Sequence, residues 1–343
     1  MQRCIELAKL GTGQVAPNPM VGAVLVHEDR IIAEGWHQQY GQAHAEVNCI
    51  NAVKEEDRHL IPLSTLYVSL EPCAHFGKTP PCADRIIKEG VRHVVIGCRD
   101  PFKQVNGRGI EKLVAVGIHT ETGILEHECI NLNKRFFTFH LLKRPFIILK
   151  WAETADGFIA GEAGQERLLI TNEYSNRLVH RWRSEEASIL VGRHTAMNDD
   201  PQLTTRTWPG NSPTRIVIDR QLQLPSRLQL FSTGSRTIIF NEQVQEEKEN
   251  LLYYKLDSSG NQLRQMLDIL HELSIQSVIV EGGTHTLQSF IDAGLWDEAR
   301  VICNEDMHIE RGLPAPQLSQ AIKTGEQSLQ SDTIYYYKND ASR

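Results

Sequence analysis

The chain has no long apolar run. Its longest apolar stretches, such as residues 91–97 and 146–149, are far shorter than the roughly 20 residues that span a bilayer as a helix. Residues 1–6 also lack the apolar segment of a secretory signal. Cysteine is scarce, at seven residues, and five of these are scattered through apolar surroundings, as buried free thiols are. These absences predict a cytoplasmic protein that does not contact membranes.

An excess of positive charge is also missing. The 343 residues include 36 Lys and Arg against 43 Asp and Glu, which gives a formal net charge of −7. Proteins that bind nucleic acid normally carry a basic surface, and this balance provides none. We therefore expect a small-molecule partner and no nucleic acid.

Against this background, one pattern of metal-ligand residues stands out. His44 and Glu46 are followed by Cys73 and Cys82. One imidazole and two thiolates suit Zn²⁺ and leave a fourth coordination position for water, while Glu46 is suited to moving protons. A histidine, a glutamate two residues later and a distant pair of cysteines form the signature of zinc-dependent nucleobase deaminases. The alternative is a structural zinc site, in which His75 would be the fourth ligand.

The loop between the two cysteines is longer than in that signature. Eight residues separate Cys73 from Cys82, where two are usual. Pro80 and Pro81 stiffen this loop, and Lys78 gives it a positive charge suited to a phosphate group. The length and charge of the loop predict a substrate larger than a bare base.

The pattern of apolar residues predicts an α/β protein of two domains, 1–143 and 144–343, because one core rarely extends over so long a chain. In the first domain, the expected helices are 2–10, 44–53, 82–89, 109–116 and a connecting helix over 123–143, and the expected strands are 21–26, 31–34, 65–70 and 93–98. In the second, the expected helices are 173–183, 262–273 and 284–293, and the expected strands are 146–151, 188–191, 215–219, 237–240, 277–281, 299–303 and 333–338. The charged run 243–250 is expected to be a solvated loop or helix end.

Several motifs together resemble the bifunctional deaminase/reductase family of riboflavin biosynthesis. They are PNPMVG at 17–22, GWH at 35–37, HAE at 44–46, EPCAHFGKTPPC at 71–82 and DP with GRG at 100–109. The resemblance covers nearly the whole chain. It implies a cytidine-deaminase-like three-layer domain followed by a dihydrofolate-reductase-like domain, and a possible homo-oligomer. It also implies deamination of a phosphorylated ribosyl-pyrimidine, then NADPH-dependent reduction of its ribosyl group to ribityl.

For the first domain, the resemblance implies a role for each matching residue. The implied zinc ligands are His44, Cys73 and Cys82, the implied proton shuttle is Glu46, and the implied substrate contacts are Asn18, His37, His75 and Lys78. Without the resemblance, Asn18 fits a turn between two prolines nearly as well, and a satisfied histidine at a strand end is the better interpretation of His37. The chain departs from the family at Phe102-Lys103, where the family usually has Asn-Pro.

The second domain has no Gly-x-Gly-x-x-Gly fingerprint for a dinucleotide. Its resemblance to the reductase half implies substrate contacts at Lys150, Arg183, Leu203, Arg206 and Glu281. It implies NADPH contacts at Ala152, Leu169, Thr195, Asp199, Gly283 and Thr284. Arg183 also fits a solvated basic face.

The chain departs from the family at three places in this half. Leu169 replaces a tryptophan that packs on the cofactor, Arg167 replaces a serine, and residues 304–308 replace a stretch like Ala-Pro-Lys-Leu. Two alternatives stay open for the whole chain. One is a deaminase with an inactive or weakly active reductase domain, and the other is a zinc-stabilised nucleotide-binding module.

Overall fold

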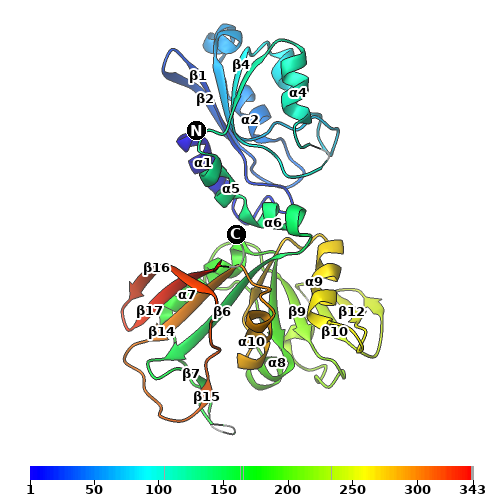
Figure 1. Ribbon diagram of the computed structural model, residues 1–343, viewed down its shortest axis with the longest axis vertical. Coiled ribbons are helices and arrows are strands. Elements are labelled where there is room, and N and C mark those ends of the chain that lie inside the picture. The colour runs from blue at the N-terminus through cyan, green and yellow to red at the C-terminus, as the bar shows by residue number, and fades with distance from the viewer. Residues whose placement is uncertain (104, 163, 165, 233, 341–343) are drawn as a thin grey trace. The chain divides into compact units, whose positions relative to one another are not determined.

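The computed structural model describes residues 1–103, 105–162, 164, 166–232 and 234–340. The chain divides into two compact units, Met1–Lys143 and Arg144–Arg343 (Figure 1). Each unit has its own sheet. In the part of the chain described, no helix is both long enough and apolar enough to cross a membrane.

The described residues of the first unit form one five-stranded sheet, in the order β2-β1-β3-β4-β5. Its strands are β1 (Gly22–His27), β2 (Arg30–Trp36), β3 (Thr65–Leu70), β4 (His93–Cys98) and β5 (His119–Thr122). The hairpin of β1 and β2 turns through Glu28 and Asp29, both at positive φ. Strand β3 pairs antiparallel with β1 and parallel with β4, so the side chains that follow β3 and β4 emerge at the same edge of the sheet.

Helices cover both faces of this sheet and make three layers. They are α1 (Gln2–Ala8), α2 (Ala45–Asn51), α3 (Cys82–Lys88), α4 (Arg108–Ala115), α5 (Glu126–Leu132) and α6 (Lys134–Leu142), with 3₁₀ turns at Lys9–Gly11 and Glu55–Leu63. Cys49, Ile86 and Leu113 bring α2, α3 and α4 into one core cluster, whereas Ile5 and Cys129 bring α1 and α5 into a cluster with the ends of β3 and β4. The central strands β1, β3 and β4 are rich in Val, Leu and Ile because both of their faces are largely buried, whereas the edge strand β5 is mostly exposed.

The single helix predicted over 123–143 is wrong. The structure has two helices, α5 and α6, which meet at Asn133 (φ −105°, ψ 24°). The side chain of Asn133 is buried, accepts a hydrogen bond from the Met20 N–H and donates one to the Met20 carbonyl, both at 2.8 Å. This pairing with a distant backbone replaces the continuation of the helix.

In the second unit, the described residues form a ten-stranded sheet in the order β11-β12-β10-β9-β8-β13-β6-β14-β17-β16, and β15 pairs with β7 (Figure 1). The strands are β6 (Phe146–Thr154), β7 (Phe158–Ala160), β8 (Ser188–Gly192), β9 (Thr214–Ile218), β10 (Thr237–Asn241), β11 (Glu246–Lys248), β12 (Leu251–Lys255), β13 (Ser277–Val280), β14 (Glu298–Asn304), β15 (Leu313–Pro314), β16 (Ala321–Leu329) and β17 (Asp332–Asn339). The strands from β12 to β14 are parallel, and β11, β17 and β16 add antiparallel edges.

The helices of this unit are α7 (Glu173–Glu185), α8 (Arg193–Asp199), α9 (Gln262–Glu272) and α10 (Thr284–Asp292), with a 3₁₀ turn at Gln229–Phe231. Leu267 and Phe290 join α9 and α10 to one core cluster, and Val179 and Ala196 join α7 and α8 to a second. The charged run 243–250, expected as a solvated loop or helix end, instead contains the fully exposed edge strand β11.

A buried ion pair joins the start of this unit to the beginning of β14. Both Nη atoms of Arg144 donate to the Asp297 carboxylate, at 2.6 and 2.8 Å, and the Ile147 N–H donates to the same carboxylate at 2.7 Å. Both charged residues are buried. The first strand of the unit is thereby fixed to a segment about 150 residues later in the chain.

We expect Asp297→Ala to destabilise the second unit by about 3–5 kcal/mol, because it leaves the Arg144 charge buried and unpaired. Denaturant unfolding followed by tryptophan fluorescence measures this loss, since Trp151, Trp182, Trp208 and Trp296 all lie in the second unit. Asp268→Ala removes an exposed partner of Arg264 and is the matched control, with an expected cost below about 1 kcal/mol. Equal effects of the two substitutions would contradict the assigned role.

Candidate functional site

Three metal-ligand side chains meet where β3 ends and where α2 and α3 begin. His44 is the residue before α2, Cys73 follows β3, and Cys82 is the first residue of α3. Their donor atoms all lie within 4.8 Å of one another. The His44 Nδ1 atom is 3.6 Å from the Cys73 sulfur and 3.3 Å from the Cys82 sulfur.

These distances fit a tetrahedral zinc ion. Zn–S bonds of about 2.3 Å and Zn–N bonds of about 2.05 Å place nitrogen and sulfur ligands about 3.5 Å apart at the tetrahedral angle. Among the described residues, the cluster contains the three predicted ligands and not His75. The arrangement therefore resembles a catalytic site with one position for a non-protein ligand, not a closed structural site.

The local backbone favours the thiolate form of Cys73. The Cys82 N–H, at the start of α3, donates to the Cys73 sulfur at 3.3 Å. Contacts with Cys82 and His44 lower the pKa of the Cys73 thiol. Zinc binds thiolates, so the site is electrostatically prepared for the metal.

Glu46 lies in the first turn of α2, two residues after His44, and is buried. Burial raises the pKa of its carboxyl to about 7, although the nearby His44 acts in the opposite direction. A carboxyl group with a pKa near neutrality can both accept and return a proton at the working pH. Burial beside the donor cluster thus gives Glu46 the properties of a proton shuttle.

Asn18 and His37 lie together next to the metal ligands. The Nδ1 atom of His37 faces the Ala43 carbonyl at 3.1 Å, and Nε2 faces the Asn18 amide nitrogen at 3.1 Å. Burial lowers the pKa of His37, so the neutral ring donates through Nδ1 and accepts through Nε2 from Asn18. The rings of His37 and His44 lie edge to face, with their centroids 5.2 Å apart. His37 has protein partners on both nitrogens, and it orients Asn18.

The long loop after Cys73 carries the other two predicted substrate residues. The Lys78 ammonium lies 4.1 Å from the centre of the Tyr40 ring. His75 lies edge to face with Phe102 at 6.0 Å, and its Nδ1 atom is buried without a hydrogen-bond partner among the described residues. This free nitrogen leaves His75 able to bind a ligand.

In the second unit, three predicted substrate residues form a buried charge cluster. Arg183 donates to both carboxylate oxygens of Glu281, at 2.9 and 2.8 Å, and the Lys150 ammonium is 3.5 Å from the same carboxylate. Burial by itself would raise the pKa of Glu281, but Arg183 and Lys150 lower it to about 2. Burial lowers the pKa of Lys150. Arg183 is therefore not part of a solvated face.

Two other predicted substrate residues lie close to this cluster in different ways. The exposed Arg206 donates to Gln202 and Thr204, and its backbone N–H donates to the His180 ring at 3.1 Å. Leu203 has a positive φ of 56° and packs its side chain into the hydrophobic core. Only its backbone is left for a contact with substrate.

The residues predicted to bind the cofactor lie on several elements. Gly283 precedes α10, and a Cβ atom there would lie 3.5 Å from the Thr195 hydroxyl on α8. Thr284 begins α10 and donates to the Pro314 carbonyl. Asp199 ends α8, and Ala152 lies on β6. The Leu169 side chain is 73% exposed and covers no part of the core.

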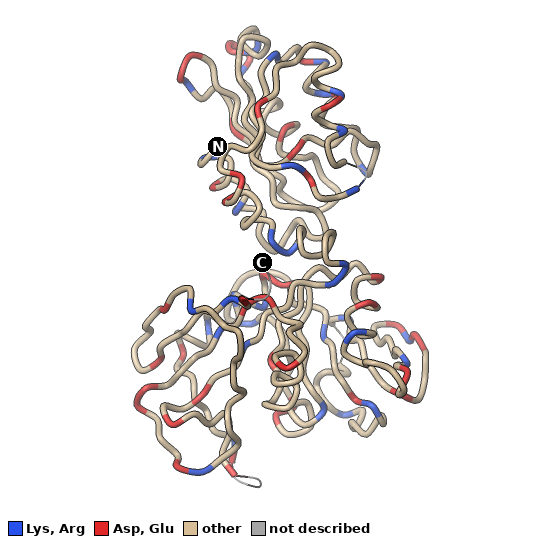
Figure 2. The backbone as a smooth tube through the Cα atoms, in the orientation of Figure 1, with Lys and Arg blue, Asp and Glu red and all other residues tan. Residues whose placement is uncertain are grey.

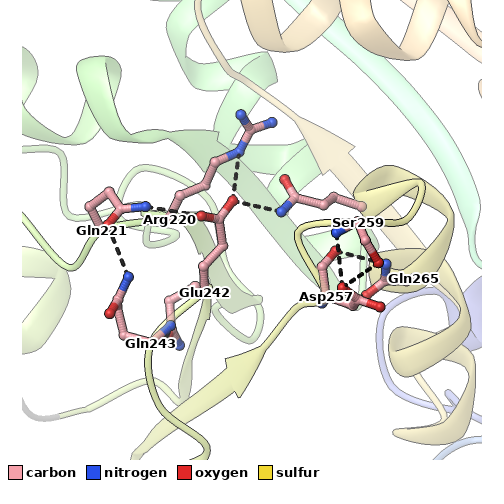
Figure 3. A network of polar contacts seen from close by, with 9 residues as sticks. Arg220, Gln221, Glu242, Gln243, Asp257, Ser259 and Gln265 are labelled. Carbon is pink, nitrogen blue, oxygen red and sulfur yellow. Dashed lines mark hydrogen bonds and ion pairs between the residues drawn. The ribbon is translucent and has the colours of Figure 1, made fainter.

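Beyond the ends of β9, β10 and β12, polar side chains pair with one another (Figure 3). Glu242 accepts hydrogen bonds from Gln221 and Gln262, at 2.9 and 2.7 Å, and Arg220 is 4.0 Å from its carboxylate. A carboxylate at the centre of this group disfavours a phosphate there. The turn at Gly283 is the better place for an anion, because the first backbone N–H groups of α10 lie there.

The sequence did not predict a role for Glu71. Its carboxylate lies near the zinc-ligand cluster and accepts several hydrogen bonds from backbone N–H groups. The side chain is 4% exposed and accepts hydrogen bonds from backbone N–H groups of Gly107 and Gly109, both at 3.0 Å. The available signal was a glutamate directly before Pro72-Cys73 together with the glycines of the later Gly-Arg-Gly motif.

Each of the two units matches a known protein family. Residues 1–98 match the zinc-binding region of cytidine and deoxycytidylate deaminases, and residues 145–304 match the RibD C-terminal domain. The riboflavin biosynthesis protein RibD of Aquifex aeolicus is 37% identical over 350 residues, covering 98% of this chain and 97% of that protein.

Solved structures extend the likeness over the whole chain. A diaminohydroxyphosphoribosylaminopyrimidine deaminase/5-amino-6-(5-phosphoribosylamino)uracil reductase from Thermotoga maritima is 36% identical, with a TM-score of 0.89 and coverage of 99% of this chain and 97% of that one. RibD of Acinetobacter baumannii is 28% identical, with a TM-score of 0.88 and coverage of 98% and 97%. The predicted fold class, a cytidine-deaminase-like domain followed by a dihydrofolate-reductase-like domain, is confirmed. The chain belongs to the RibD family, the bifunctional deaminase/reductase enzymes of riboflavin biosynthesis.

Proposed function

We propose that the first unit hydrolyses the 2-amino group of a 2,5-diamino-6-ribosylamino-pyrimidinone 5′-phosphate, and that the second unit uses NADPH to reduce the ribosyl group of the product. The observation that carries the deaminase assignment is the His44, Cys73 and Cys82 cluster with the buried Glu46 beside it. The Thermotoga relative is named for both activities. The substrate is a small molecule. Acidic and basic residues are interspersed along the described parts of both units (Figure 2).

In the first unit, each side chain has a defined task. Bound zinc supplies a Lewis acid that makes water nucleophilic near neutral pH. The carboxylate of Glu46 takes a proton from the attacking water and returns it to the departing amino group. The neutral His37 ring accepts a hydrogen bond from Nδ2 of Asn18 and thereby orients the Asn18 amide. The Oδ1 atom of Asn18 is left to contact the polar edge of the pyrimidine ring.

The phosphate of the substrate is assigned to the long loop. The ammonium of Lys78 is held over the Tyr40 ring, close to the segment that leads to His44. The free Nδ1 atom of His75 lies on the same loop. The ammonium of Lys78 and the imidazole of His75, both on the loop that follows Cys73, suit the phosphate end of a phosphorylated sugar.

In the second unit, NADPH supplies the hydride. The backbone N–H groups at Gly283 and Thr284 suit a cofactor phosphate, and the exposed Leu169 offers an apolar contact. Lys150 and Arg183 carry two positive charges against the single negative charge of Glu281, and this surplus suits the substrate phosphate or sugar. The role of the protein is to hold substrate and cofactor in contact while excluding water.

A deaminase with a weak reductase is the second candidate, because Arg167 and Leu169 depart from the family pattern at the cofactor side. Supplying the diaminopyrimidine substrate with NADPH and following the absorbance of NADPH distinguishes the two. Consumption of NADPH after release of ammonia supports the bifunctional enzyme, and ammonia without NADPH consumption supports the second candidate.

We also propose a cytoplasmic location and a homo-oligomeric state. Each of the seven cysteines, all within the described residues, is a free thiol, and thiols persist in a reducing compartment. The homo-oligomeric state is proposed by analogy with the family. Sedimentation of the purified chain measures the oligomeric state directly.

Glu46→Gln is expected to lower the rate of ammonia release by at least about 100-fold, because the amide cannot shuttle a proton. The zinc content and the NADPH-dependent step are expected to stay at wild-type values, since the substitution preserves shape and lies in the first unit. Elemental analysis and the two activity assays check this. Ammonia release near the wild-type rate would remove Glu46 from the mechanism.

Cys73→Ser is expected to reduce bound zinc from one ion per chain to well below one, and to destabilise the first unit, because metal binding is coupled to folding. Metal content by elemental analysis and thermal unfolding measure these effects. Cys49→Ser, a buried cysteine of α2 outside the cluster, is the control for the loss of a thiol. Zinc retained in full by Cys73→Ser would contradict the ligand set.

Glu281→Gln is expected to lower kcat/KM of the reductase by about 10- to 100-fold, because it weakens the charged hydrogen bonds from Arg183 and removes the ion pair with Lys150. The deaminase activity is expected to stay unchanged.

The lowered pKa of Glu281 adds a pH effect: the carboxylate stabilises the fold above its ordinary pKa of 4.5, and this stability is lost as the pH falls towards 2. Unfolding of the second unit between these pH values should therefore be less pH-dependent in the variant.

A further inference from the structure

We propose that Glu71 is a positioning residue for the deaminase: its carboxylate holds the segment of residues 100–103 and 105–110 over the Cys73 turn, so that Phe102 fixes His75, a proposed substrate contact. This inference rests on the proposed function of the first unit. It gives a task to a buried acidic group that is neither a metal ligand nor a proton shuttle.

The first step of the argument is the hydrogen bonding of the carboxylate. Of the described residues, Asp100 and Gly107 donate backbone N–H groups to Oε2, at 3.3 and 3.0 Å. Gly109 and Ile110 donate theirs to Oε1, at 3.0 and 3.4 Å. One side chain thereby closes both ends of the segment and also satisfies free N–H groups in the first turn of α4.

The second step is how closely this segment approaches the ligand turn. A Cβ atom at Gly109 would lie 1.9 Å from the Pro72 carbonyl oxygen, so the α4 backbone lies directly against the residue before Cys73. Gly107 has a φ of +82°, which glycine adopts without strain. The close approach and this turn allow the carboxylate of Glu71 to reach both parts of the segment.

The third step links the segment to the substrate side. Phe102 is half-buried, and its backbone N–H donates to the Asp100 carboxylate at 2.7 Å. Its ring lies edge to face with His75 at 6.0 Å and next to His140 at 4.9 Å. His75 keeps its buried Nδ1 atom without a partner among the described residues. Phe102 therefore orients a ring that has an unused hydrogen-bonding atom.

The backbone of the segment is set by the carboxylate of Glu71 and not by the side chain at position 102. That side chain is then free to serve as an apolar wall. Removing the carboxylate should loosen the wall and leave the three zinc ligands in place.

The experiment compares Glu71→Gln with Glu111→Gln in the full-length, zinc-loaded chain. Glutamine keeps the shape of Glu71 but turns one acceptor into a donor that faces backbone N–H groups, whereas Glu111 is exposed in the same helix. We expect Glu71→Gln to raise KM for deamination by about 10-fold or more, with one zinc ion per chain and wild-type reductase activity. Glu111→Gln should change none of these quantities.

A double-mutant cycle with Phe102→Ala tests whether the effect passes through the ring. If Glu71 acts by holding Phe102, the KM of the double variant will be close to that of Phe102→Ala alone, not the product of the two effects. An unchanged KM in Glu71→Gln, multiplicative effects, or loss of zinc that accounts for the whole defect would each overturn the proposal.

Hydrogen exchange tests the same contacts without turnover. The amides of Gly107, Gly109 and Ile110 should exchange faster in Glu71→Gln than in the wild-type chain and in Glu111→Gln. Equal exchange rates would refute the positioning role even if no ammonia is released. A wild-type chain that binds zinc but releases no ammonia would refute the proposed function separately.

Discussion

The convergence of one imidazole and two thiols at the end of a single strand is the constraint on which the first unit depends. His44, Cys73 and Cys82 come from three different elements, and their donor atoms meet only because β3 delivers Cys73 to the starts of α2 and α3. The same convergence buries Glu46 on the first turn of α2. The zinc-ligand cluster and the buried proton shuttle are therefore consequences of one packing arrangement.

The two units use buried carboxylates in opposite ways. Among the residues that the structure describes, Glu46 has no guanidinium or ammonium partner, and burial raises its pKa to about 7, so it can exchange protons. Glu281 is also buried, but Arg183 and Lys150 lower its pKa to about 2, so it stays charged. Burial is common to both, and the neighbouring cations decide whether a carboxyl serves as an acid–base group or as a fixed charge. The different neighbours of Glu46 and Glu281 therefore suit the first unit to proton transfer and the second unit to the binding of charged ligands.

The sequence predicted the features that depend on local patterns. The alternation of helices and strands and the meeting of His44 with the two cysteines were visible, because residue type and spacing carry this information. Features that depend on contacts between residues far apart in the chain could not be predicted from the sequence. The break at Asn133 comes from Met20, more than 100 residues earlier. The exposed strand β16 has little apolar pattern to reveal it, and Glu71 owes its connections to backbone groups that any sequence possesses.

The pairing of Asn133 with Met20 also bears on where this catalytic module ends. The match to the deaminase zinc-binding region stops at residue 98, but the hydrogen bonds at Asn133 reach back to the segment that presents Asn18. A fragment cut at the end of that match would leave both backbone groups of Met20 without these partners and would expose the apolar side of α1. The packing of the first unit therefore depends on α5 and Asn133, which lie well beyond the part that carries the recognisable motifs.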